Sequence, residues 1–102
     1  MGLYMIQFAY TPDAWASYIK NPQDRRPALD ARAQQLGGKL VSYHYCFGEY
    51  DGVLTVEAPD DTTAAAIAIG AIAPGHIKAS KTTKLLTVEE TIAALRKAGS
   101  VT

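Results

Sequence analysis

Apolar and polar positions alternate along the chain with the spacing of strands and helices in a regular order. The aromatic and branched run Leu3–Tyr10 predicts a first strand. Thr11-Pro12-Asp13 then ends that strand and begins a helix, because threonine caps, proline suits the first turn and aspartate favours the positive end of the helix dipole. We expect the helix to pause at Asn21-Pro22, to restart near Asp24 and to end at Gly37-Gly38.

The next segment predicts a hairpin of two strands, Lys39–Phe47 and Gly52–Ala58, with a four-residue loop between them. This loop length would place His44 opposite Thr55. One face of the hairpin would then carry Ser42, His44, Cys46, Thr55 and Glu57. The opposite face is the more apolar one and would carry the helices; it holds Val41, Tyr43, Tyr45, Phe47, Leu54, Val56 and Ala58.

A second long helix is predicted after Pro59, with Asp60 or Asp61 as its cap. Its stretch Ala64–Ala73 is apolar on nearly every side, whereas a helix that covers one face of a small sheet usually has a polar back. Pro74-Gly75 ends this helix, and Ile77 to Leu86 predicts a last strand at the edge of the sheet.

The C-terminal segment predicts one further, short helix. Thr87-Val88-Glu89-Glu90 has the spacing of a capping box, and the helix should close near Gly99. Together the elements predict an α+β fold over residues 1–102 as a single domain, with ferredoxin-like β-α-β-β-α-β order. The helices would lie on one face of the antiparallel sheet, and the other face would be open.

The open face predicts self-association. The first strand is apolar on both sides, and only Gln7 interrupts it. A sheet with one side in water should alternate more cleanly. A second copy packed sheet against sheet, as in dimeric α+β barrels, would cover this face, and a homo-oligomer would also account for the apolar second helix.

The amino-acid composition argues against several classes of function. Ten basic and ten acidic residues cancel, which argues against binding to nucleic acids or to an anionic membrane surface. Cys46 is the single cysteine, which leaves no internal disulfide and no multi-cysteine metal site. The start of the chain does not resemble a signal peptide, and the longest apolar stretch is too short to span a bilayer. We therefore expect a cytoplasmic protein.

Candidate chemistry gathers on the open face. Gln7, His44, Thr55 and Glu57 would line a space between two packed sheets, and there His44 is the candidate general acid or base. The alternative is that His44 is a hydrogen-bonded filler of the hairpin. The residues predict neither a metal site nor a bound cofactor.

The loop Gly48–Gly52 is the most distinctive segment. Glycines at its two ends permit positive φ in a tight reversal, and Asp51 can accept backbone hydrogen bonds within the turn. Turn chemistry alone would explain these residues. The alternative is a lid in which Tyr50 and Asp51 contact a ligand.

Several segments resemble one known family. They are Gln7, Tyr10-Thr11-Pro12, Asn21-Pro22 with Asp24-Arg25, Leu36-Gly37-Gly38-Lys39, Gly48-Glu49-Tyr50-Asp51, Pro59-Asp60 and Leu85-Leu86-Thr87-Val88-Glu89-Glu90. Their order along nearly the whole chain resembles the GYD domain family. The resemblance implies a ferredoxin-like fold related to the dimeric α+β barrels, a group that includes cofactor-free monooxygenases, isomerases, haem-degrading proteins and ligand-sensing domains. No haem-ligation motif is present to carry over.

Three functions are therefore expected as alternatives. The first is a homo-oligomer that binds a small organic molecule between its sheets, with Gln7, His44, Thr55 and Glu57 lining the site and Tyr50 near its mouth. The second is a cofactor-free oxygenase or isomerase that uses His44 as its acid or base. The third is an assembly or interaction module.

Overall fold

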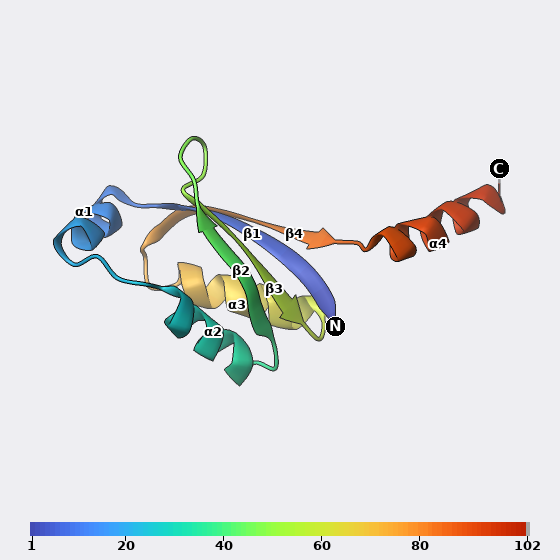
Figure 1. Ribbon diagram of the computed structural model, residues 1–102, viewed down its shortest axis with the longest axis horizontal. Helices are drawn as coiled ribbons and strands as arrows, with labels where there is room; N and C mark the ends of the chain where they lie inside the picture. Colours follow the sequence, from blue (N-terminus) through green and yellow to red (C-terminus); the bar gives the residue numbers. More distant parts are fainter. Residues whose placement is uncertain (102) are drawn as a thin grey trace.

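The computed structural model describes residues 1–101 and consists of an antiparallel sheet with helices on one side (Figure 1). The elements follow one another as β1 (Gly2–Tyr10), α1 (Pro12–Lys20), α2 (Arg26–Gln35), β2 (Lys39–Tyr45), β3 (Gly52–Ala58), α3 (Asp61–Ile72), β4 (Ile77–Leu85) and α4 (Val88–Gly99). The strand order is β2-β3-β1-β4, with antiparallel neighbours throughout. The predicted α+β, ferredoxin-like fold is confirmed.

The predicted helix boundaries are also confirmed by their caps. The Thr11 side chain accepts a hydrogen bond from the Ala14 amide at the start of α1, and the Asp60 carboxylate accepts one from the Thr63 amide, 2.8 Å away, at the start of α3. Thr87 and Glu90 form the predicted capping box of α4. These contacts satisfy amides that have no partner within a helix, so α1, α3 and α4 begin where the sequence indicates. Helix α2 begins at Arg26, and its N-cap residue Arg25 makes no capping hydrogen bond with its side chain.

The core lies between the sheet and the helices. Alternate residues of β1 and β3 point into it, while α1, α2 and α3 contribute mainly alanines, which let the helices approach the strands closely. The buried set is Tyr4, Ile6, Phe8, Tyr10, Ala14, Ala33, Leu54, Val56, Ala58, Ala64, Ile67 and Ala68. No side chain from β2, which is at the edge of the sheet, is fully buried.

The predicted hairpin register is wrong by two residues. His44 pairs with Val53 rather than Thr55, and Ser42 pairs with Thr55. The ladder ends at the pair Tyr45 and Gly52, because the connecting loop is longer than four residues and includes Cys46 and Phe47. A shift of two keeps each side chain on its face, so Ser42 and His44 still lie on the open side as predicted.

A β-bulge changes the pairing of β2 with β3 at the other end of the hairpin. The register shifts between Leu40 and Ser42, so Val41 is the extra residue and Leu40 pairs with Val56. Leu40 consequently packs against the core in the place expected for Val41, which is 51% exposed. Phe47, also expected on the helix side, lies in the loop and is fully exposed.

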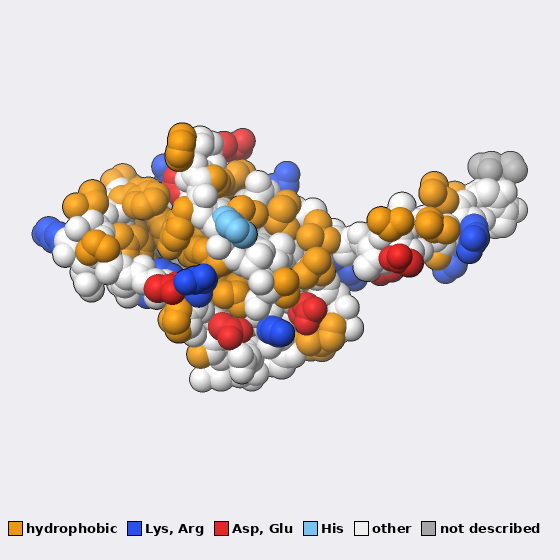
Figure 2. Space-filling model, viewed as in Figure 1, with side chains coloured by type: hydrophobic (Ala, Val, Ile, Leu, Met, Phe, Trp, Pro, Cys, Tyr) orange, Lys and Arg blue, Asp and Glu red, His pale blue; other side chains and the backbone are white. Residues whose placement is uncertain are grey.

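Helix α4 stands away from the body of the molecule (Figure 1). All of its residues are exposed, although Val88, Ile92 and Leu95 form an apolar stripe with helical spacing. Figure 2 shows hydrophobic side chains along this projecting helix. The stability of an amphipathic helix comes mainly from packing of its apolar face, and residues 1–101 leave this face exposed.

Candidate functional site

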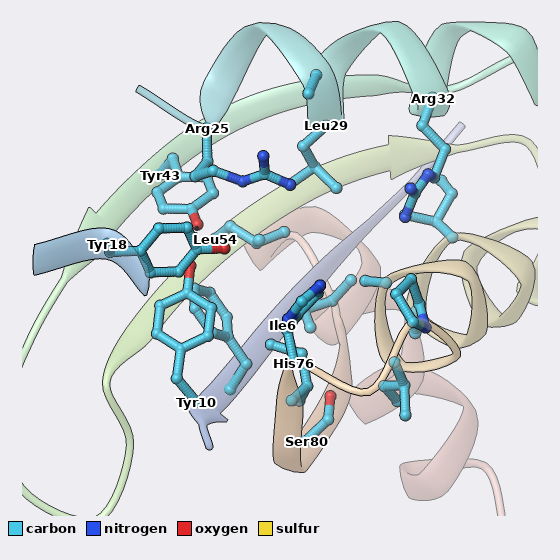
Figure 3. A pocket seen from close by; sticks show the side chains of 18 residues that line it. Ile6, Tyr10, Tyr18, Arg25, Leu29, Arg32, Tyr43, Leu54, His76 and Ser80 are labelled. Carbon is cyan, nitrogen blue, oxygen red and sulfur yellow. Dashed lines mark hydrogen bonds between the residues drawn. The ribbon is translucent and has the colours of Figure 1, made fainter. Parts of the chain in front are cut away.

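A cavity of about 110 Å³ lies between the helix side of the sheet and the helices. The three helices α1, α2 and α3 and the start of β4 border it, and most of its walls are apolar. It is partly open to solvent, because lining residues such as His76 and Ser80 are exposed. The lining residues are Ile6, Phe8, Tyr10, Tyr18, Arg25, Ala28, Leu29, Arg32, Tyr43, Leu54, Ile67, Ala68, Ala71, Ile72, Pro74, His76, Ile77 and Ser80 (Figure 3). For scale, an apolar cavity of roughly 150 Å³ binds benzene, so this smaller space, which is open on one side, suits a ligand no larger than a single ring or a short chain.

Tyrosine hydroxyls form one end of the cavity. The Tyr10 hydroxyl lies 3.3 Å from that of Tyr43 and 3.4 Å from that of Tyr45, and the last two lie 3.3 Å apart. The rings of Tyr10 and Tyr18 meet edge to face with centroids 5.1 Å apart. The hydroxyl of the buried Tyr10 therefore has partners in Tyr43 and in the half-exposed Tyr45, as a buried tyrosine requires.

Burial raises the pKa of Tyr10 and that of Tyr43 well above the ordinary value, because a phenolate would be desolvated there. Hydrogen bonds from the neighbouring tyrosines act in the same direction on Tyr10. Both groups are therefore neutral hydroxyls at any physiological pH. They can orient a ligand by hydrogen bonds, but they are poor candidates for a catalytic base.

Basic side chains border the cavity on its helix side. Arg25 directly precedes α2, Arg32 lies within that helix, and both are half-buried. Arg32 donates a hydrogen bond from Nη1 to the Gly70 carbonyl, 2.7 Å away, which ties α2 to α3. In Figure 3 the Arg25 side chain runs beneath α2 toward Leu29, and His76 lies across the space near Ile6.

The residues expected to form the site lie on the other side of the sheet. Gln7 and His44 both pair with Val53, one from each neighbouring strand, so they stand in one row on the open face. Two strand spacings, about 9.6 Å, separate them, which is too far for direct contact. Thr55 pairs with Met5 in the next row and exchanges a hydrogen bond of 2.6 Å with Ser42.

Glu57 lies one row further along the same face, opposite Leu3 on one side and Lys39 on the other. The sheet therefore brings Gln7, His44, Thr55 and Glu57 onto one surface, as expected, in three successive rows. Their proposed enclosure depends on a second molecule, so their role in binding stays a prediction.

His44 is exposed, and its ring forms no side-chain hydrogen bond with any residue of 1–101. A general acid or base is usually oriented by a second group, which this chain does not supply at His44. The acid–base role stays a prediction that rests on the open face alone.

Asp51 holds the hairpin loop against β1 and α1. Its carboxylate accepts a hydrogen bond from the Tyr10 amide at 2.8 Å and one from the Trp15 indole at 3.3 Å, and its own amide donates to the Phe8 carbonyl. These hydrogen bonds explain why an aspartate occupies position 51, because they fix the conformation of the loop. Tyr50 is half-buried beside it, and its carbonyl accepts a weak hydrogen bond from the Cys46 thiol. A ligand contact by either residue stays a prediction.

Neither a metal cluster nor a membrane-crossing helix is found among residues 1–101. Within the described chain, no group of three or more His, Cys, Asp or Glu side chains is placed to hold a metal ion. No helix of this part of the chain combines the length and the apolar character needed to cross a bilayer.

The sequence interpretation missed the cavity on the helix side. Asp24-Arg25-Arg26 had the pattern of a solvated helix start, and Tyr43 and Tyr10 that of core packing. One signal was present: Tyr10 and Tyr43 occupy inward positions of their strands, and buried hydroxyls call for polar partners nearby. That signal marks a polar end of the core but not the empty space beside it.

Comparison with known proteins agrees with this architecture. The sequence model of the GYD domain matches residues 4–95. A search of curated protein sequences finds no significant match.

Solved structures are similar in fold. MtbAldR superposes with a TM-score of 0.60 at 14% identity, over 84% of this chain and 53% of that one, so the chain spans about half the length of MtbAldR. TTHA0845 from Thermus thermophilus gives 0.55 at 15% identity, over 86% and 96% of the two chains. The hypothetical protein PHS023 from Pyrococcus horikoshii gives 0.53 at 12% identity, over 85% and 92%. At these identities the likeness concerns the fold alone.

Proposed function

The chain belongs to the GYD domain family, and from that premise we propose that it is a homo-oligomeric protein that binds a small organic molecule in the cavity between its helices and its sheet. The observation that carries the proposal is the cavity itself. It has apolar walls, a cluster of neutral hydroxyls at one end and arginines at its border. Apolar pockets with a few convergent polar groups are the usual form of a small-molecule site.

Filling the cavity should abolish binding. Ala71 lies on α3, half-buried, and lines the space, so Ala71→Leu places a branched side chain where the ligand would lie. We expect the affinity for one-ring fragments, with benzoate and benzamide as probes, to fall about tenfold or more. Ligand-observed NMR on the purified full chain measures this.

The matched control is Ala66→Leu, on the same helix, where the side chain is exposed and lines neither this cavity nor the shallow groove between α3 and β4. It should bind the fragments as the unaltered protein does. Failure of both fragments to bind the unaltered protein, or equal binding by the Ala71→Leu variant, would refute a ligand site in this cavity.

The open sheet face is proposed as the surface that a second copy covers. Leu3, Met5, Val53 and Leu85 lie on it and are only half-buried within one chain. Apolar side chains gathered on one partly exposed face are typical of a protein–protein contact. The apolar stripe of α4 is proposed to pack on the same partner, because it finds no place on its own body.

A charge on this face should separate the copies. Met5 sits in the middle row between Thr55 and Thr83, so Met5→Lys would bury an unpaired ammonium at the contact. We expect the dissociation constant to rise about a hundredfold, since removing an unpaired charge from water costs roughly 3 kcal/mol or more. Sedimentation velocity at micromolar concentration measures it.

Ile19→Lys is the control for that experiment, because Ile19 on α1 is 77% exposed and far from the sheet face in the fold. This variant should sediment like the unaltered protein. A monomer for the unaltered protein at micromolar concentration would contradict the oligomer.

The same face is the proposed second location for a ligand or for chemistry. Gln7, His44, Thr55 and Glu57 would meet in the space between two copies, with Tyr50 at its edge and His44 as the acid or base of an isomerase-like or oxygenase-like reaction. Their common orientation favours this arrangement. A cytoplasmic location suits the protein, because its free thiol at Cys46 is exposed.

A further inference from the structure

The charges around the helix-side cavity are of one sign. Arg25 and Arg32 line it, and none of the lining residues is acidic. The chain as a whole is balanced, with ten basic and ten acidic residues, so this arrangement is local. Walls of low polarity strengthen the field of the charges at their border, and a cavity of this kind favours an anion.

Arg25 is the arginine that is free to hold that anion. The neighbouring carboxylate of Asp24 is occupied by Arg26, which donates to it from Nε at 3.0 Å and from Nη2 at 2.9 Å. Within the described chain the Arg25 guanidinium has neither a hydrogen bond nor an ion pair. Its five N–H donors are therefore available on a half-buried side chain, whereas Arg32 already donates to Gly70.

The rest of the cavity suits an apolar body. Apolar side chains form most of its walls, among them Ile6, Leu29 and Leu54, and the hydroxyls of Tyr10 and Tyr43 stay neutral. An anion that carries a ring or a short chain would keep its charge at Arg25 and remove its apolar part from water, a gain of about 25 cal/mol per Å² of apolar surface.

We propose that the ligand of this cavity is an apolar carboxylic acid with one ring or a short chain, whose carboxylate pairs with Arg25. The inference rests on the proposed function and gives it a ligand class. A carboxylate matches the planar fork of one guanidinium through two parallel hydrogen bonds. A phosphate carries more charge and more acceptor oxygens than a single free arginine satisfies.

Benzoate and its neutral isostere benzamide test the charge. We expect the full-length protein to bind benzoate about ten- to a hundredfold more tightly than benzamide, the range of a hydrogen bond to a charged group. Arg25→Gln should remove this preference and leave benzamide binding unchanged. Arg25→Lys, which keeps the charge but loses the fork, should fall between the two, and isothermal titration calorimetry measures all three proteins.

Arg96→Gln is the matched control, because it removes the same charge from the exposed helix α4. It should retain the preference for benzoate. If the unaltered protein bound benzoate and benzamide with equal affinity, and Ala71→Leu weakened both, the proposal of a carboxylate ligand would be wrong. The proposal of a small-molecule site in this cavity would still hold. Tighter binding of phenyl phosphate than of benzoate would overturn the carboxylate proposal too, and no binding of any probe would overturn both proposals.

Discussion

Gly52→Ala lowers the free energy of unfolding by about 3 kcal/mol, at the upper end of the range for an overpacked core. A Cβ at this position would lie 2.2 Å from Phe8 Cζ and 2.7 Å from both Cε atoms of the ring. Phe8 is only 5% exposed and packs edge to face on Tyr10 and Tyr43, so the ring has nowhere to move without displacing the tyrosines that end the cavity. Chemical denaturation at fixed protein concentration measures the change.

The control for this prediction is Gly99→Ala at the end of α4. An added Cβ meets no atom within 4 Å there, and alanine favours the helix by up to about 1 kcal/mol. This variant should be as stable as the unaltered protein or slightly more so. If Gly52→Ala also left the stability within about 0.5 kcal/mol, the close contact of glycine and ring would have no energetic weight.

Ile67→Ala lowers the free energy of unfolding by about 3–4 kcal/mol, the usual loss for a fully buried isoleucine. Ile67 has no exposed surface and is, with Val56, one of the largest fully buried side chains. It lies on α3 between the sheet and the helix-side cavity, so truncation removes packing and enlarges an existing empty space. Such sites cannot collapse fully around the deletion, which keeps the loss large.

Ile19→Ala makes the same deletion at a side chain that is 77% exposed, and it should change stability by no more than about 0.5 kcal/mol. Denaturant midpoints with unchanged slopes would show that the loss in the Ile67→Ala variant arises in the folded state. Equal losses in the two variants would contradict the position of the core between α3 and the sheet.

Much of the fold follows from local sequence signals. Thr11, Asp60 and Thr87 begin helices as their capping chemistry predicts, and Gly37 ends α2 with a φ of 85°. The alternation of apolar positions in β3 identified the core side of the hairpin correctly, since side chains on a strand alternate strictly. These signals depend on a few neighbouring residues, and for that reason they survive in the folded chain.

Features that depend on residues far apart in the sequence could not be predicted from it. The longer loop shifts the hairpin by two residues, and the bulge at Val41 places Leu40 inward; both reflect packing of β2 on β3 rather than local preference. Of the two loop glycines, Gly48 has a positive φ and Gly52 does not. The Phe8 ring leaves no room for a side chain at position 52, which explains the glycine there. A contact of this kind between two strands leaves no trace in either segment alone.

The candidate site was also predictable only in part. Gln7, His44, Thr55 and Glu57 share a face, as the alternation predicts, because an even shift in register does not exchange the faces. The helix-side cavity could not be predicted from the sequence, because it depends on the separation of α2 and α3. The unpaired arginine at its border depends on which residue pairs with Asp24. That partner is Arg26 and not Arg25, and only the three-dimensional arrangement shows it.

Mapping amide chemical shifts by NMR while benzoate is added to the isotopically labelled protein tests the helix-side site most directly. We predict that the changes cluster at Leu29, Ala68 and Ile77, which surround the cavity. Changes confined to Gln7, His44 and Thr55 on the opposite face of the sheet, or no changes at all, would contradict this prediction.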